Sequence, residues 1–248
     1  MATLDEYREL IEDYLAGLPF APELGGLNEA MRYSLEGGGK RIRPLLCLAC
    51  GEATGSTPEE LLPAAAAVEL VHTFGMVHDD LPALDDDALR RGRATSHVQF
   101  DEATAILNGD ALLAQAFELA LSYPTPAVAR ELSRATLGMI GGQHDDVRGG
   151  SEDLARLHAL KTGRLFEAAI GCALAVGDIP EPDRKPWRTF AAEFAAARIS
   201  RLARSSLTAR AIAAAPDRTA SRASARSRAF APRNPPATAA TSASSSAS

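Results

Sequence analysis

The stretch LVHTFGMVHDDLPALDDDALRRG, residues 70–92, indicates the fold and contains the highest density of candidate functional residues in the chain. Its first half has apolar side chains at three- and four-residue spacing, which indicates a helix with a buried face. Pro82 cannot donate a helical hydrogen bond and disfavours helix in the residue before it, so this helix ends near Asp80. Five carboxylates and two arginines then follow one another across the end of a single helix.

The same helical periodicity extends through the first 194 residues. Thr57, Pro58 and Glu60 form the capping signature of a helix start, so the helix that contains this stretch should begin there. We expect it at about 58–80, with further helices at about 101–122, 127–141, 152–176 and 183–197. Alternating β-branched runs are absent, so the predicted fold class is all-α. The polar stretches GGQHDDV (141–147) and LKTG (160–163) interrupt this pattern.

Composition indicates a globular protein for most of the chain. A length of 248 residues with 46% hydrophobic content is enough to bury a sizeable core. The N-terminus is acidic and amphipathic, and no run of eighteen apolar residues occurs, so we expect neither a signal peptide nor a membrane span, and a cytoplasmic location. Cys47 and Cys50 have no second ligand pair, and Cys172 stands alone; we expect all three to be small core residues.

Charge divides the chain near residue 194. Residues 1–194 hold 17 basic and 31 acidic side chains, whereas 195–248 hold nine arginines and one acid, Asp217. In 195–248, 39 of 54 residues are Ala, Arg or Ser, a composition that predicts disorder beyond about residue 215. We therefore predict a domain over 1–194 and a tail over 195–248. Nucleic-acid binding by this tail is disfavoured, because its only aromatic residue is Phe230 and it contains no recognisable module.

The acidic cluster indicates a cation site. Asp79 and Asp80 lie at a helix C-terminus, which is the negative end of the helix dipole, and three more acids follow at 85–87. Two like charges about 4 Å apart repel by roughly 4 kcal/mol at an effective dielectric near 20, and a bound cation removes that repulsion. Oxygen ligands favour Mg²⁺, with Mn²⁺ or Ca²⁺ as alternatives; an EF-hand is excluded by Leu81 and Ala83. Taken alone, the cluster fits a solvated acidic loop about as well.

Basic groups flank the acids on both sides. Arg90 and Arg91 are fixed donors suited to phosphate oxygens. Upstream, EGGGKRIRP (36–44) places glycines and cations at a helix start, where free backbone N–H groups favour an anion. It is not a P-loop, and a glycine-rich hinge with a basic surface is the alternative. His72 lies two helical turns, about 10.5 Å, before Asp79 on the same face.

Five segments in this order and spacing resemble the trans-isoprenyl diphosphate synthase family of farnesyl and geranylgeranyl diphosphate synthases. They are GGGKRIRP (37–44), the stretch at 70–92, FDEATAILNGDALL (100–113), GGQHDD (141–146) and LHALKTGRLFEAAI (157–170). The resemblance covers about residues 5–194. It implies an isoprenoid-synthase-type helical bundle around a central cavity, usually a homodimer, that joins an allylic diphosphate to isopentenyl diphosphate, with no nucleic-acid or membrane partner.

The resemblance also implies a role for each matched residue. The Mg²⁺ ligands would be Asp79, Asp80 and Asp85, which with Arg90 and Lys161 form the catalytic set. The allylic diphosphate would be held by Arg90, Lys161 and Thr162, and isopentenyl diphosphate by Lys40, Arg43, His72 and Arg91. The cavity would be lined by Gln143 and Asp146. Product length would be set by Phe74 and Gly75, and the phenylalanine ring favours C15 over C20.

One part of the family pattern is absent. The family carries a second aspartate-rich motif on a later helix, whereas Asp217 is the only acid after Glu193 in this chain. The abrupt change in composition is what an out-of-frame reading of a GC-rich gene produces, so we expect incomplete C-terminal helices and very low activity. The alternative is a non-catalytic partner subunit of an active synthase, which the intact first cluster disfavours. A terpene cyclase is disfavoured by GGGKRIRP, which serves a second diphosphate.

Overall fold

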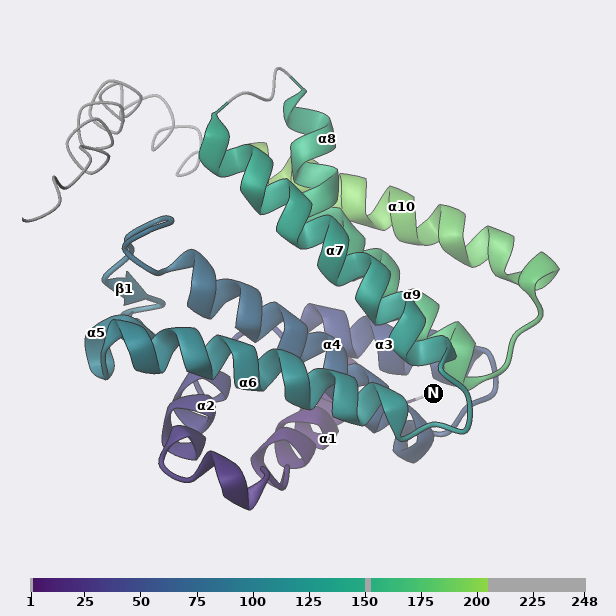
Figure 1. Ribbon diagram of the computed structural model, residues 1–248. Helices are drawn as coiled ribbons and strands as arrows, with labels where there is room; N and C mark the ends of the chain where they lie inside the picture. The colour runs from purple at the N-terminus through teal and green to yellow at the C-terminus, as the bar shows by residue number, and fades with distance from the viewer. Residues whose placement is uncertain (1, 150–152, 205–248) are drawn as a thin grey trace, which may run out of the picture. The chain divides into compact units, whose positions relative to one another are not determined.

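The computed structural model describes residues 2–149 and 153–204 and is built of helices (Figure 1). The chain between the helices 58–79 and 102–121 contains a two-residue antiparallel ladder. The elements are α1 (Leu4–Ala16), the 3₁₀ turn η1 (Pro22–Leu24), α2 (Leu27–Leu35), α3 (Ile42–Ala53), α4 (Pro58–Asp79), β1 (Leu89–Arg90), β2 (Arg93–Ala94), α5 (Ser96–Gln99), α6 (Glu102–Leu121), α7 (Ala127–Arg148), α8 (Leu154–His158), the π-helical turn η2 (Ala159–Gly163), α9 (Arg164–Val176) and α10 (Glu181–Arg204). The all-α fold class is confirmed.

Helix α4 forms the centre of the bundle and packs against α3, α6 and α9 (Figure 1). Its residues 64–71 are all buried, and four of them are alanines. Small side chains let neighbouring helices approach closely on several sides. By length and composition α4 is apolar enough to cross a membrane, but 67% of its apolar window is buried inside the protein, as in the core helix of a water-soluble protein.

The start of α4 lies at the predicted capping signature. The Thr57 side chain accepts a hydrogen bond from the Glu60 N–H, and the Glu60 carboxylate accepts one from the Thr57 N–H at 2.8 Å. One turn later Pro63 lies inside the helix. The Tyr123 hydroxyl accepts a hydrogen bond from the Ala64 N–H at 3.0 Å and donates one to the Glu60 carbonyl at 2.7 Å. It thus bridges two backbone groups, one on each side of Pro63, that an undisturbed helix would pair with each other.

Arg41 joins three parts of the bundle at the start of α3. It has a left-handed backbone, with φ of 45°, and is only 4% exposed. Its guanidinium donates to Glu12 of α1 at 2.8 Å, to Glu69 of α4 at 2.7 Å and to the Leu35 carbonyl at 2.6 Å. The turn that carries the basic segment 37–44 is therefore fixed by one buried charge pair, with Glu69, and one partly exposed pair, with Glu12.

Gly109 of α6 is the point at which α6 lies against the last turns of α4. A Cβ at this position would lie 2.1 Å from Nε2 of His78, whose ring also bonds the Ile106 carbonyl at 2.9 Å. The same ring also meets Phe74 edge to face with ring centroids 4.9 Å apart, so moving it would break two contacts. The glycine is therefore required by packing rather than by its backbone angles.

We expect Gly109→Ala to lower the free energy of unfolding by about 1–3 kcal/mol, since it overpacks this contact. Gly141→Ala on α7 is the matched control, because a Cβ there meets nothing within 4 Å. The control should be unchanged or more stable by about 0.5–1 kcal/mol. Urea denaturation of the two variants measures the difference. Equal stabilities would contradict the close approach of α6 and α4.

Two sequence expectations about helix bounds need correction. The polar stretch 141–147 does not interrupt a helix, because α7 continues through it to Arg148. The expected helix 152–176 is helical from residue 154 to 176, and the stretch 160–163 lies in a π-helical turn within it. α10 extends to Arg204, ten residues past the change in composition at 194. The expected disorder beyond 215 falls outside the described residues.

The cysteine expectation is confirmed. The three cysteines are buried free thiols in the core. Burial raises the pKa of the Cys50 thiol to about 11, so it stays protonated at neutral pH. Such thiols are packing groups rather than nucleophiles.

Candidate functional site

The acidic residues lie on a tight turn at the end of α4. Asp79 is the last helical residue and Asp80 is the C-cap. The Asp85 N–H donates to the Asp79 carbonyl at 2.9 Å, and the Asp86 N–H donates to the Leu81 carbonyl. These backbone bonds fold the chain back, so two residues six positions apart meet at the helix end. Asp86 has a φ of 55°, a conformation that aspartate tolerates better than most residues.

A cavity of about 320 Å³ opens beside Asp79 between α4, α7 and η2. Its walls are mainly apolar, and its few polar groups include Asp79 and Lys161, whose charges act on each other. The lining includes Phe74, Gly75, His78, Asp79, Leu84, Met139, Ile140, Gln143, Val147 and Lys161. An apolar cavity with a few convergent polar groups is typical of a small-molecule site. The structure therefore places the predicted product-length residues in one cavity with the predicted metal and diphosphate residues.

Asp79 has the most perturbed carboxyl of the turn. Burial raises its pKa to about 6, the Asp85 charge adds to this, and the Lys161 charge opposes it. A half-buried carboxylate next to another acid is stabilised by a cation. The perturbation marks this position as a candidate functional group.

Asp80 does not face the cavity but binds Arg90. The carboxylate is only 3% exposed and accepts from Arg90 Nε at 2.9 and 2.8 Å, and from Nη2 at 2.5 Å. Arg90 also lies 3.9 Å from Asp87. In this arrangement Asp80 holds the 89–94 ladder against α4. Direct metal binding by Asp80, or diphosphate binding by Arg90, would need this pair to open.

Lys161 and Gln143 are two further polar residues that line the cavity. The Lys161 ammonium donates to Asp146 at 2.8 Å. Although burial lowers the pKa of Lys161, the hydrogen bond to Asp146 and the charges of Asp79 and Asp85 raise it overall, so it stays a cation. Both amide atoms of Gln143 are buried without a hydrogen-bond partner in the described part of the chain. A buried unpaired amide costs about 1–3 kcal/mol, which a bound polar ligand recovers.

Lys161 is brought to α7 by Gly142. A Cβ on Gly142 would lie 2.6 Å from the Lys161 backbone nitrogen. The two polar stretches of the sequence, 141–147 and 160–163, therefore meet at this glycine. Thr162 follows Lys161 in the same π-helical turn and is half-buried.

A second group of side chains, which is cationic, comes from the basic segment 37–44 and from Arg91. Arg43 Nε is buried without a hydrogen-bond partner among the described residues, and its guanidinium lies 4.5 Å from the centre of the Phe166 ring. Burial lowers the pKa of His72 well below its usual range, and the charges of Arg43 and Arg91 add to this. A Cβ on Gly39 would lie 2.5 Å from Arg91 Nη1. The glycine-rich segment and Arg91 are thus adjacent, as a shared anion site requires, while Lys40 is exposed.

The acidic turn fits a magnesium ion only if the ligand supplies part of the shell. Among residues 2–149 and 153–204, no three His, Cys, Asp or Glu side chains lie close enough to hold a metal by themselves. Mg²⁺ commonly takes one or two carboxylates and completes its octahedron with water and substrate phosphates. Asp79 and Asp85 supply oxygen donors of that kind, and the predicted ligand set contains no soft-metal ligand.

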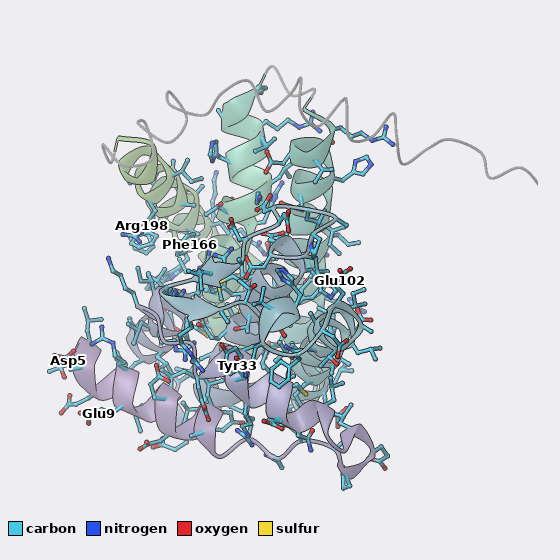
Figure 2. The ribbon with its side chains drawn as sticks, turned by 90° about the vertical axis from the view of Figure 1, so that its left-hand side faces the viewer. Asp5, Glu9, Tyr33, Glu102, Phe166 and Arg198 are labelled. Carbon is cyan, nitrogen blue, oxygen red and sulfur yellow. The ribbon has the colours of Figure 1, made fainter. Side chains whose placement is uncertain are left out.

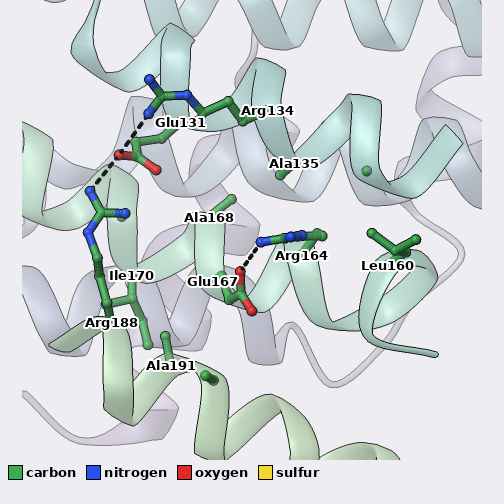
Figure 3. A pocket seen from close by; sticks show the side chains of 13 residues that line it. Glu131, Arg134, Ala135, Leu160, Arg164, Glu167, Ala168, Ile170, Arg188 and Ala191 are labelled. Carbon is green, nitrogen blue, oxygen red and sulfur yellow. Dashed lines mark hydrogen bonds and ion pairs between the residues drawn. The ribbon is translucent and has the colours of Figure 1, made fainter. Parts of the chain in front are cut away.

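A larger hollow of about 560 Å³ lies between α7, α9 and α10 (Figure 3). Its charged side chains are already paired with one another. Glu131 binds Arg188 at 3.2 Å and lies 3.9 Å from Arg134, while Arg164 binds Glu167 at 3.0 Å. The larger volume of this hollow therefore does not make it a better candidate site than the 320 Å³ cavity, because its charged side chains are paired with one another and not free to bind a ligand.

The sequence analysis expected Gln143 and Asp146 to line the cavity but missed the rest of the wall that α7 contributes. Met139, Gln143 and Val147 lie at four-residue spacing along one face of that helix, whereas Asp146 is not among the lining residues. The spacing was readable in the sequence, but the expected helix end at 141 divided it. Phe166, which lies beneath Arg43, was also missed, because nothing in its local sequence signals that contact.

Comparison with known proteins gives the same family along most of the described chain. The model of the family described as "Polyprenyl synthetase" matches residues 25–197. Farnesyl diphosphate synthase of Bacillus subtilis (strain 168) is 41% identical over 179 residues, which are 66% of this chain and 60% of that relative. Geranylgeranyl diphosphate synthase of Cyanophora paradoxa is 39% identical over 203 residues, 76% of this chain and 68% of the relative.

Solved structures agree with these relatives. The crystal structure of a geranyltransferase from Legionella pneumophila superposes with a TM-score of 0.70 at 35% identity, covering 78% of this chain and 74% of that one. The chain spans about 60% of the length of the Bacillus subtilis relative that it matches.

Proposed function

The chain belongs to the polyprenyl synthetase family, and from that premise we propose that it joins an allylic diphosphate to isopentenyl diphosphate, giving a longer trans-prenyl diphosphate with C15 favoured. The observation that carries this proposal is one largely apolar cavity whose lining includes Asp79, Lys161 and Gln143. The relatives whose printed names are farnesyl and geranylgeranyl diphosphate synthase support it.

Asp79 and Asp85 are the residues proposed to hold Mg²⁺, with diphosphate oxygens and water as its other ligands. When bound, the ion neutralises the charge that grows on the departing diphosphate. Lys161 contributes an ammonium to the cavity lining, and the Gln143 amide offers its NH2 group as donor and its carbonyl oxygen as acceptor. These groups stabilise the leaving diphosphate while the allylic carbon–oxygen bond breaks.

The remaining steps depend on the cationic group and on the cavity walls. Arg43 and Arg91 would hold the diphosphate of isopentenyl diphosphate, so that its double bond attacks the allylic cation and forms the new carbon–carbon bond. A proton then leaves the adjacent carbon, and we propose that the released diphosphate accepts it. The apolar walls, formed by side chains such as Met139 and Ile140, keep water from the cation.

Prenyl transfer by the purified chain tests this function. Dimethylallyl and geranyl diphosphates are supplied with isopentenyl diphosphate and Mg²⁺, and products are separated by chromatography. We expect slow, Mg²⁺-dependent formation of a C15 diphosphate, since the described residues contain one acidic cluster instead of two. A soluble chain that binds both substrates and makes no product would contradict the proposal and favour the partner-subunit alternative.

We propose that Phe74 limits product length. Its ring is 7% exposed, lines the cavity beside Gly75 and lies one helical turn before His78. Phe74→Ala should lengthen the cavity and shift the product from C15 toward C20 or longer. Phe190→Ala is the control, because Phe190 is 44% exposed on α10 and does not line this cavity. An unchanged product distribution in Phe74→Ala would refute the role of the ring.

A homodimer is the proposed assembly. Large apolar side chains remain exposed on α6 and α7, at Ile106, Leu107, Leu121, Leu137 and Ile140. Adjacent helices with several exposed leucines and isoleucines are a common basis for association. Ile140 also lines the cavity, so pairing through this face would bring a second copy close to the site. We propose a cytoplasmic location for the assembly.

A further inference from the structure

Arg198 of α10 reaches the cationic group that contains Arg43. One turn earlier, Phe194 meets the Phe166 ring edge to face, with centroids 5.6 Å apart. Arg43 lies over the same Phe166 ring at 4.5 Å. The labels of Arg198 and Phe166 lie on the same side of the protein in Figure 2. The charge of Arg198 acts on Arg43, so the two arginines lie near each other, although 155 positions separate them in the sequence.

The position of Arg198 is fixed by packing on both sides of it. A Cβ on Gly163 of η2 would lie 3.7 Å from the Ala195 side chain and 3.8 Å from Ile199. This is ordinary van der Waals contact, so α10 lies directly on the π-helical turn that carries Lys161. The last turns of α10 therefore lie near both groups of residues predicted to bind diphosphate, the one with Lys161 and the one with Arg43.

The two guanidiniums have no counter-ion in the described chain. The Nε atoms of Arg43 and Arg198 are both buried, and neither has a hydrogen-bond partner among residues 2–149 and 153–204. The nearby acid, Glu69, is already bound to Arg41 at 2.7 Å. Burial lowers the pKa of Arg43 to about 10; Glu69 opposes this, while Arg198 and Arg91 add to it. Partly buried cations that repel one another are stabilised by a bound anion.

We propose that Arg198 is a diphosphate-binding residue, which together with Arg43 holds the diphosphate of the non-allylic substrate. This inference rests on the proposed function and assigns to it a residue from beyond the change in composition at 194. Guanidiniums bind phosphate oxygens directly in a bidentate geometry, so this site needs no metal ion. The acidic turn and the Arg43–Arg198 pair then differ in their requirement for Mg²⁺.

Titration calorimetry of the full chain with inorganic pyrophosphate in EDTA tests the inference. Arg198→Ala should weaken pyrophosphate binding at least about tenfold, a typical loss for one charge-assisted contact. Arg198→Lys should recover part of the affinity, because lysine restores the charge without the bidentate geometry. Arg188→Ala is the matched control on the same helix, since Arg188 is paired with Glu131 and lies away from Arg43. It should bind pyrophosphate like the parent chain.

Thermal unfolding separates a binding role from a structural one. Removing an unpaired buried charge should leave the melting temperature unchanged or raise it, whereas loss of a structural contact lowers it. If Arg198→Ala fails to fold, Arg198→Gln keeps the stem and removes the charge, and the same titration applies to it.

Each outcome separates this inference from the proposed function. Unchanged pyrophosphate binding in Arg198→Ala, with weaker binding in Arg43→Ala, overturns the role of Arg198 and leaves prenyl transfer standing. A parent chain that binds no pyrophosphate without metal overturns the cationic site altogether. A chain that makes no prenyl product but binds pyrophosphate through Arg198 supports the inference while the proposed function fails.

Discussion

Replacing Asp79 by asparagine is expected to lower the kcat/KM of prenyl transfer by about a thousandfold. Asparagine keeps the shape of the side chain and removes the charge that positions the cation. Loss of several kcal/mol of charge stabilisation at the departing diphosphate corresponds to that factor. Steady-state assays with geranyl diphosphate and isopentenyl diphosphate measure it, and the KM for isopentenyl diphosphate should change little.

Asp86→Asn is the matched control for this variant. Asp86 belongs to the same turn but is exposed, and asparagine tolerates its left-handed backbone as well as aspartate does. Its activity should stay close to that of the parent chain. If both variants lose activity equally, the turn as a whole matters and the specific role of Asp79 is wrong.

Arg41→Ala is expected to have the largest effect on stability, about 3–5 kcal/mol, the usual penalty for breaking a buried ion pair. The substitution leaves the Glu69 carboxylate, in a residue 3% exposed, without its guanidinium at 2.7 Å. It also removes the donor to the Leu35 carbonyl. Guanidinium chloride unfolding gives the free energy directly.

Glu12→Gln provides the comparison for Arg41. The Glu12 side chain is 43% exposed, so its pairing with Arg41 is partly screened by solvent. We expect a loss of at most about 1 kcal/mol for this variant. A loss below 1 kcal/mol in Arg41→Ala would show that the buried pair contributes little to holding α1, α3 and α4 together.

Local signals explain which parts of the fold were predictable. The start of α4 follows from the capping box at Thr57, and its end follows from Pro82; both act within one turn of the chain. The all-α class follows from the three- and four-residue spacing of apolar side chains, and the structure confirms it. Gly75 and Asp79 share a cavity, as four-residue spacing on a helix indicates, whereas the five-residue spacing of Phe74 from Asp79 does not predict this by itself.

Tertiary contacts explain the parts that were not predictable. Gly142 lies inside α7 because it admits the backbone of η2, and the same glycine in isolation reads as a helix breaker. Asp80 looked equivalent to Asp79, but its side chain points to Arg90 across the turn. Arg198 lies in a segment whose composition predicts no packed structure, yet α10 continues through it. In each case the deciding partner is distant in sequence.

The metal dependence of allylic diphosphate binding tests the central claim most directly. Titration calorimetry with geranyl S-thiolodiphosphate, an unreactive allylic analogue, is carried out with Mg²⁺ and with EDTA. We predict binding at least about tenfold tighter with Mg²⁺, a difference of about 1.4 kcal/mol, and loss of that gain in Asp79→Asn. Equal affinity with and without Mg²⁺, or the same Mg²⁺ gain in Asp79→Asn, would contradict the assignment of the acidic turn as the metal-dependent diphosphate site.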